Sequence, residues 1–270
     1  MLKFQSSLRQ FTEATGSLKL YEELRNDLEP QAIEEDFEKK PPNVRGDIKF
    51  SKVTMNYPNA ATSAIKGIDL MIPSRSTVAL VGASGSGKTT IANLLCGLIT
   101  PSSGEISIDG VSYNAISISA LQRSIGYVTQ ESAVFNGNLT ENLTLWETQP
   151  DIQRVENILE QLELRNIGEG SKTTTFGNHL IGGDGAQLSG GERQRIGIAR
   201  ALIFNPEILI FDEATSALDT FTENEILKDI NSLPNKTIIM ISHRMNTLKY
   251  CDKIYLVENG RIVDEGPFSK

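Results

Sequence analysis

A short glycine-rich stretch carries the residue types best suited to binding phosphate groups. It runs from Gly82 to Thr89 and reads G-x-x-x-x-G-K-T. Glycines at positions 82, 85 and 87 permit backbone conformations that other residues avoid, so successive N–H groups can turn inward around an anion. Lys88 is placed to reach the outer phosphates, and the Thr89 hydroxyl to ligate a magnesium ion. The pattern indicates a nucleoside triphosphate with its metal as the ligand.

Two elements must position this loop, and the sequence predicts both. The apolar run at 78–81 predicts a buried strand, and residues 89–95 have apolar positions at helical spacing. A helix that starts at the loop adds its unpaired N–H groups and the positive end of its dipole to an anion site. The predicted nucleotide contacts of this unit are Gly82, Ser84, Gly85, Ser86, Gly87, Lys88, Thr89 and Thr90.

Two carboxylates follow a second buried strand. The run at 208–211 is apolar throughout and ends in Asp212 and Glu213, which places both acids at the rim of the sheet where the phosphates are expected. Asp212 suits a magnesium ion that keeps part of its water shell, and Glu213 suits the water that attacks the terminal phosphate. Taken alone, the motif also fits a strand that simply ends in solvated acids.

A second small-residue turn opens a helix at 188–195, which reads L-S-G-G-E-R-Q-R. Ser189, Gly190 and Gly191 there predict another anion-binding helix N-terminus. Because the chain already has one phosphate-binding loop, we expect the second site to serve the nucleotide of another copy.

In this order and spacing, the three motifs resemble the nucleotide-binding domain of an ABC transporter, over roughly residues 46 to 266. The resemblance implies ATP and Mg2+ as cofactors and hydrolysis that requires dimerisation. It also implies a head-to-tail dimer, in which Ser189, Gly190 and Gly191 of one copy close over the ATP held by the other.

Four further positions match the family one at a time. Tyr57 resembles the aromatic residue that stacks on adenine, and Gln130 the glutamine that senses the metal and the attacking water. Asp219 resembles the aspartate of the loop that crosses the dimer interface, and His243 the histidine that contacts the γ-phosphate. Each position alone also suits an ordinary structural residue, but together they agree with the phosphate loop. The implied catalytic residues are Lys88, Gln130, Glu213 and His243, and the implied metal ligands are Thr89, Gln130 and Asp212.

The predicted fold class is α/β, with a P-loop NTPase core and a mainly parallel sheet. Apolar runs at 78–81, 208–211 and 238–241 predict central strands that are covered on both faces. Alternating residues at 48–55 and 68–72 predict an antiparallel β subdomain.

Two further patterns complete the predicted fold. The Asn-Gly pair at 259–260 predicts a hairpin. An inserted α-helical subdomain is expected at about 131–195.

The chain divides into two predicted parts. Residues 1–46 are expected to form an amphipathic helix and an acidic linker from a missing transmembrane domain, and residues 47–270 the ABC ATPase domain. The stretch 130–143 resembles the exporter branch, with a glutamine followed by Phe-x-Gly and Glu-Asn. We therefore expect an exporter-type half-transporter that drives export or flipping of a substrate. An importer ATPase subunit and a soluble, non-transport ABC ATPase are the alternatives.

Two positions depart from the family pattern. Glu192 stands where relatives most often have glutamine, and Gly183 where exporters commonly carry an acidic residue that touches the partner's coupling helices. Asp184 could take over that contact.

Composition limits the kinds of partner, metal site and cellular location that we expect. The net charge of −8 and the sequence pI near 5.0 argue against nucleic acid as the main partner. The two cysteines suggest neither a zinc site nor a disulfide framework. No apolar run reaches the roughly 18 residues that a transmembrane helix needs. We expect a location at the cytoplasmic face of the membrane within an integral transporter, and solubility as an isolated fragment.

Overall fold

The computed structural model describes residues 46–58, 60–164, 180–181, 188–215, 218–242 and 244–268. The helix and linker predicted for residues 1–46 lie outside these ranges, apart from Gly46. In the described part of the chain, no helix is both long enough and apolar enough to cross a membrane.

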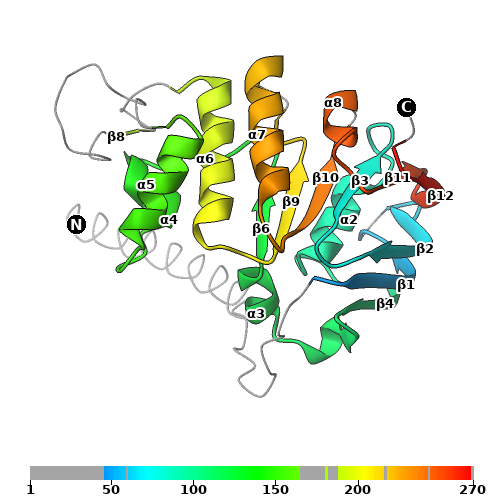
Figure 1. Cartoon of the computed structure of the whole chain (residues 1–270). Helices are drawn as coiled ribbons and strands as arrows, with labels where there is room; N and C mark the ends of the chain where they lie inside the picture. The colour runs from blue at the N-terminus through cyan, green and yellow to red at the C-terminus, as the bar shows by residue number, and fades with distance from the viewer. Residues whose placement is uncertain are drawn as a thin grey trace, which may run out of the picture. The chain divides into compact units, whose positions relative to one another are not determined.

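The central sheet of the described chain has six strands in the order β12-β11-β3-β10-β9-β6 (Figure 1). Their bounds are β3 Thr77–Val81, β6 Ile125–Val128, β9 Ile208–Asp212, β10 Thr237–Ile241, β11 Lys253–Glu258 and β12 Arg261–Gly266. All neighbours are parallel except β11 and β12, which form an antiparallel hairpin. Asn259 and Gly260 both have positive φ at the turn of this hairpin, as a two-residue primed turn requires. The predicted mainly parallel sheet and the hairpin are confirmed.

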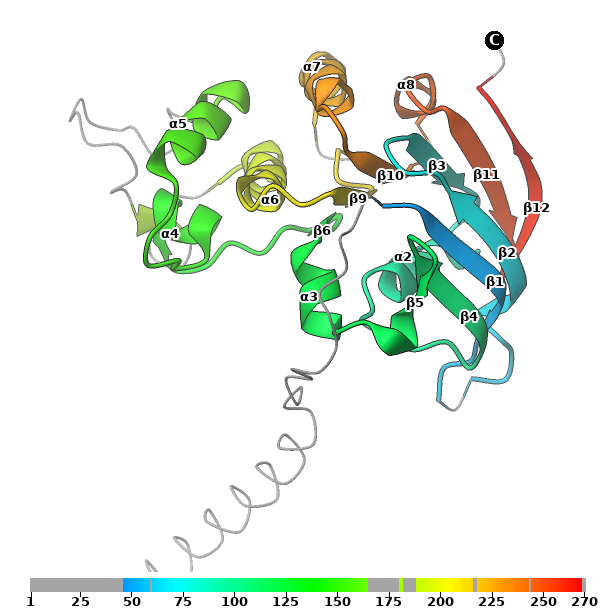
Figure 2. The same ribbon diagram turned by 60° about the horizontal axis from the view of Figure 1, so that its bottom comes forward.

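The central strands are buried on both faces. Every residue of β9 and β10 is buried. Ile208 and Ile210 pack into one hydrophobic cluster, whereas Leu209 and Phe211 pack into a second, because successive side chains of a strand point to opposite faces. Figure 2 shows what covers the two faces: α2 (Lys88–Leu95) lies on one, and α6 (Gly190–Ile203) and α7 (Thr220–Ser232) lie on the other.

A smaller antiparallel sheet covers α2 from its other side. Its described strands have the order β2-β1-β4-β5, with bounds β1 Ile48–Met55, β2 Ile65–Ile72, β4 Ser103–Ile108 and β5 Val111–Ser112. Phe50, Ile106 and Ile91 of α2 share one hydrophobic cluster, so this sheet encloses the helix that follows the phosphate loop. The antiparallel subdomain is confirmed, although the sequence patterns predicted neither β4 nor β5.

The region between β6 and β9 is mainly helical where it is described. It contains α4 (Leu139–Thr144), α5 (Ile152–Gln161) and the short pair β7 (Gly137–Asn138) and β8 (Leu180–Ile181). Helix α6 continues to Ile203, so the boundary predicted at residue 195 falls inside a helix. The limits of this subdomain stay a prediction. The other short helices of the described chain are η2 (Tyr113–Ala115), α3 (Ile118–Arg123) and α8 (Met245–Leu248).

Strand order decides which residues meet. Strands β3, β10, β9 and β6 are parallel neighbours, so their carboxyl ends lie along one edge of the sheet. Gly82 follows β3, Asp212 ends β9, and Thr129 follows β6. The phosphate loop, the two acids and the start of the segment around Gln130 therefore lie on the same edge.

Candidate functional site

The phosphate loop joins β3 to α2 in the geometry that its glycines predict. Gly82, Gly85 and Gly87 have φ values of 153°, 76° and 111°. A Cβ atom on Gly82 would collide with the carbonyl oxygen of Val257, and one on Gly87 would lie 2.8 Å from Cδ1 of Ile65. At these two positions, close packing as well as backbone conformation requires glycine.

The loop closes around the ammonium group of Lys88. Its Nζ donates to the carbonyl oxygens of Gly82 and Ala83 at 2.9 and 2.8 Å, and lies 3.4 Å from Oγ of Ser86. The lysine is buried, so its positive charge is concentrated inside the loop. A charge held there, next to the start of a helix, attracts an anion.

Thr89 and Asp212 meet although 123 positions separate them. The Thr89 hydroxyl donates to Oδ2 of Asp212 at 3.1 Å, and the Tyr127 hydroxyl donates to the same oxygen at 3.2 Å. Burial raises the pKa of the Asp212 carboxyl, whereas the hydrogen bonds from Thr89 and Tyr127 lower it. Burial and the neighbouring Asp212 raise the pKa of Tyr127 as well, so Tyr127 keeps its proton and acts as a donor.

The Thr89 hydroxyl and the Asp212 carboxylate fit a magnesium ion. Magnesium prefers oxygen ligands and is usually held by one or two protein groups plus phosphate oxygens and water. The described residues contain no group of three or more His, Cys, Asp or Glu side chains that could hold a metal. The Thr89 hydroxyl and the Asp212 carboxylate supply oxygen groups of the kind that magnesium accepts from a protein.

Glu213 has an unusual backbone for a residue with a side chain. Its φ is 51°, in the left-handed region, and its N–H donates to the carbonyl oxygen of Ile241 at 2.9 Å. Such conformations persist where surrounding contacts determine them, and they cluster at functional sites.

An open cleft of about 890 Å³ brings most of the predicted site residues together. Its lining includes Gly82, Ser84, Gly85, Gly87, Lys88, Thr89, Thr90, Gln130, Asp212 and Glu213. Gln130 is exposed, and its carbonyl oxygen accepts a hydrogen bond from Nε2 of Gln194 at 3.3 Å. Tyr57 is 37% exposed and lies beside this cleft, with its hydroxyl 3.4 Å from Oγ1 of Thr90.

The residues predicted to serve a second copy are not in the cleft lining. Ser189 caps α6, and Gly190 and Gly191 form its first turn. The N–H and the hydroxyl of Ser189 both donate to Oε2 of Glu192, at 2.7 and 2.8 Å, and the Glu192 N–H donates back to Oγ of Ser189 at 3.2 Å. Hydrogen bonds from Ser189 lower the pKa of Glu192. The helix start that was predicted to receive an anion thus already binds a carboxylate of its own.

Asp219 caps α7 by accepting hydrogen bonds from the N–H groups of Phe221 and Thr222, each at 3.1 Å. The hydrogen bonds from Thr222 lower its pKa. His243 lies outside the described residues, as do Ser216 and Ala217 before Asp219 and the segment 182–187 with Gly183 and Asp184.

The motifs did not reveal Tyr127. It lies in β6, a four-residue strand whose sequence Ile-Gly-Tyr-Val is short and interrupted by glycine. Only the pairing of β6 with β9 brings its hydroxyl to Asp212. A short run of β-formers directly before Gln130 was the available signal.

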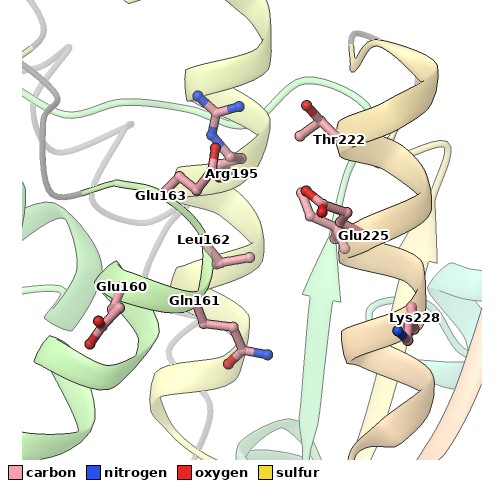
Figure 3. Close-up of a pocket in the computed structure, with 9 residues that line it drawn as sticks. Glu160, Gln161, Leu162, Glu163, Arg195, Thr222, Glu225 and Lys228 are labelled. Carbon is pink, nitrogen blue, oxygen red and sulfur yellow. The ribbon is translucent and has the colours of Figure 1, made fainter.

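A second cavity, of about 280 Å³, lies away from these residues between α5, α6 and α7 (Figure 3). Charged side chains of both signs line it, among them Glu163, Arg195, Glu225 and Lys228. No predicted site residue that the structure describes lines this cavity. It is therefore separate from the phosphate cleft.

Comparisons with known proteins identify the family. The family model described as ABC transporter matches residues 65–216. The transport/processing ATP-binding protein ComA of Streptococcus pneumoniae is 41% identical over 83% of this chain and 31% of its own length. The alpha-hemolysin translocation ATP-binding protein HlyB of Escherichia coli O157:H7 is 39% identical over 83% of this chain and 32% of its length. An ATP-dependent lipid A-core flippase of Chromobacterium violaceum is 40% identical over 83% of this chain and 38% of its length.

A solved structure is similar as well. A bacterial Atm1-family ABC exporter with ATP bound superposes with a TM-score of 0.76 at 33% identity, and the match covers 84% of this chain and 41% of the exporter chain. The chain thus spans about a third of the length of the curated relatives described above. The matched family region runs from β2, through the phosphate loop, to the loop after Asp212 and Glu213. The chain belongs to the ABC transporter family.

Proposed function

We propose that this chain powers export or flipping of a substrate across a membrane as the ATPase part of an exporter. The observation that carries the proposal is the cleft at the ends of β3 and β9, in a chain about 40% identical to translocation and flippase ATP-binding proteins. Two copies would bind two ATP molecules head to tail, and hydrolysis would let the copies separate.

Each copy holds its nucleotide through the phosphate loop. The N–H groups of the loop and of the first turn of α2 bind phosphate oxygens, and Lys88 neutralises their charge. Tyr57, beside the cleft and 37% exposed, is placed to stack on the adenine. The Thr89 hydroxyl and the Asp212 carboxylate would hold magnesium together with Gln130. When bound, the metal supplies positive charge that neutralises the phosphates as the bond to the γ-phosphate breaks.

Glu213 is the proposed base. Phosphoryl transfer depends mainly on position and charge, and a carboxylate at the rim of the cleft can orient and polarise a water molecule in line with the γ-phosphate. His243 is proposed to contact that phosphate, and Gln130 to sense the water.

The second copy completes the site. Ser189, Gly190 and Gly191 are exposed or partly exposed at the start of α6, and they are absent from the cleft lining of their own chain. We propose that they contact the γ-phosphate held by the partner copy, and that Asp219 lies at the same interface. The donors around that phosphate then assemble only in the dimer.

A transmembrane domain is the second proposed partner. A groove of about 790 Å³ lies between α3, β6 and α6, and exposed Leu145 and Phe204 are among its lining residues. Beside it, Phe135 and Trp146 are 43% and 50% exposed, and Arg200 lies 5.2 Å from the centroid of the Phe135 ring. An exposed apolar surface of this kind marks an interaction site. We propose that it receives the membrane part, which places the chain at the cytoplasmic face of the membrane.

The decisive experiment replaces Glu213 with glutamine. Glu213→Gln should slow hydrolysis by at least about 100-fold and trap an ATP-bound dimer, because the amide cannot accept a proton from water. Steady-state ATPase assays and size-exclusion chromatography with ATP measure the two effects.

The matched control is Glu265→Gln, the same chemical change in an exposed ion pair with Lys253 of the β11–β12 hairpin. This variant should hydrolyse ATP as the original chain does. A Glu213→Gln variant with undiminished turnover would refute the role of Glu213. Full-rate hydrolysis by a strict monomer would refute the dimer.

A further inference from the structure

Glu223 is a nearly fully buried carboxylate, with 1% of its surface exposed. It lies in the first turn of α7. A buried carboxylate is costly unless charge and hydrogen bonds compensate for the lost water. The positions of its partners therefore indicate what the burial achieves.

The partners of Glu223 come from two different loops. Oε2 pairs with Nη1 of Arg244 at 2.8 Å, and Oε1 accepts the Thr215 hydroxyl at 2.8 Å. Nη1 of Arg244 also donates to the carbonyl oxygen of Thr215 at 3.4 Å. The three residues thus form a closed network, here called the Glu223 network.

The Glu223 network connects the segments that hold Glu213. Thr215 lies two positions after Glu213 in the loop that follows β9, and Arg244 lies in the segment that follows β10. The backbone of Glu213 is itself bonded to the last residue of β10, through its N–H and the carbonyl oxygen of Ile241. Since Glu213 has a φ of 51°, its conformation depends on contacts that fix the chain on both sides of it.

The same helical turn also carries Asp219. Asp219 is the N-cap of α7, and its carbonyl oxygen accepts the N–H of Glu223 at 2.9 Å. Glu223 is therefore bonded to the loop of Glu213 through its carboxylate and to Asp219 through its backbone N–H.

We propose that Glu223 is a positioning residue for ATP hydrolysis. Its buried carboxylate, bonded to Thr215 and Arg244, fixes the loop of Glu213 relative to the helix start that carries Asp219. ATP binding within one copy does not need this alignment, whereas the hydrolytic step does. The inference rests on the roles proposed above for Glu213 and Asp219.

The test is Glu223→Gln, which keeps the size of the side chain and an oxygen acceptor but removes the charge that pairs with Arg244. We expect kcat to fall roughly 10- to 100-fold, because small displacements of a reacting group reduce rates by such factors. The KM for ATP and the Kd of a fluorescent ATP analogue should change by less than about twofold, because the substitution leaves the contacts that bind ATP unchanged.

A double-mutant cycle with Arg244→Gln asks whether the pair acts as one unit. If it does, the double variant should have the kcat of the slower single variant rather than the product of the two losses.

Thr77→Val is the matched control for stability. The buried Thr77 donates from Oγ1 to Oδ1 of Asn231, at the opposite end of α7, at 2.9 Å. This variant loosens the anchoring of the same helix without touching the Glu223 network. It should lower Tm and leave kcat within about twofold.

The outcomes separate the two proposals. A low kcat for Glu223→Gln with normal binding, and a near-normal kcat for Thr77→Val, support the positioning role. An unchanged kcat for Glu223→Gln overturns it, and so does a fall in kcat that Thr77→Val reproduces at equal loss of Tm. If Glu213→Gln still hydrolyses ATP at full rate, the proposed base is wrong, whatever Glu223→Gln does.

Discussion

The helices α2 and α6 both begin at a glycine-rich turn, but α2 has no side-chain cap and α6 has one. Helix α2 starts after Gly87, which has φ 111°, without a side-chain cap and without an acidic residue in its first turn. Helix α6 starts after Ser189, and Ser189 and Glu192 cap each other reciprocally.

The difference separates two kinds of helix start. A helix that must bind an external anion keeps its first N–H groups and its dipole available, and α2 does so beside a buried lysine. In α6, the Glu192 carboxylate accepts the Ser189 N–H and the Ser189 hydroxyl accepts the Glu192 N–H, so two of the four N–H groups at this helix start are bonded within the chain. Similar turns in sequence therefore give α2 an uncapped start, which we propose binds phosphate, and α6 a capped start, which we propose acts on the nucleotide of another copy.

The largest losses of unfolding free energy and of ATP affinity should come from Gly87→Ala at the start of α2. A Cβ atom there would lie 2.8 Å from Cδ1 of Ile65 and 3.0 Å from the carbonyl oxygen of Ala64, in a backbone with φ 111°. We expect a loss of more than about 2 kcal/mol in unfolding free energy from strain and overpacking. ATP affinity should fall by at least about tenfold as the loop shifts. Urea unfolding and calorimetric ATP titration measure both quantities.

Gly110→Ala is the control for Gly87→Ala. Gly110 also has a positive φ, 79°, but a Cβ atom there has no heavy atom within 4 Å. It should lose only about 1–2 kcal/mol and bind ATP normally. Unaltered ATP binding by Gly87→Ala would show that the close-packed loop does not define the site.

A smaller loss of unfolding free energy is expected from Ser189→Ala at the start of α6. Losing the cap should reduce the unfolding free energy by about 1 kcal/mol. ATP binding to the monomer should not change, because Ser189 does not line the cleft of its own chain. A variant with the original stability would mean that the reciprocal cap does not form in solution.

The smallest expected effects are pH-dependent changes in Tm, which differ in sign between the two helix starts. Burial raises the pKa of Asp212, beside α2, whereas hydrogen bonds from Ser189 lower that of Glu192. At neutral pH, ionised Asp212 destabilises the fold, so Asp212→Asn should raise Tm, and the gain should shrink as pH falls through the raised pKa. Glu192→Gln should lower Tm at neutral pH, and that loss should vanish as pH falls through the lowered pKa.

Thermal unfolding at several pH values measures these shifts, each expected to be under about 3 °C. Shifts of the same sign in both variants would contradict the contrast between the two helix starts.

The sequence predicted the parts of the site that consist of consecutive residues better than the parts that depend on contacts between distant residues. The phosphate loop was predictable because its strand, glycines and helix are consecutive, and its positive φ values agree with that prediction. Strand β6 and Tyr127 were missed, because a four-residue strand with a glycine has too weak a pattern to stand out. Glu192 was noted as a departure from the family pattern, but its bond to Ser189 depends on the geometry of the first helical turn.

The sequence by itself determined which residue types stand in the phosphate loop and at the end of β9, and from these types and short segments of backbone we predict phosphate binding and action on water. Only the tertiary structure decided their distances. The strand order β3-β10-β9-β6 brings Thr89 and Tyr127 to one oxygen of Asp212, and burial then shifts the pKa of that carboxyl. The same packing places Thr215 and Arg244 on the two oxygens of Glu223. The pairing of distant strands sets these contacts, and pairing depends on the whole hydrophobic core rather than on any one motif.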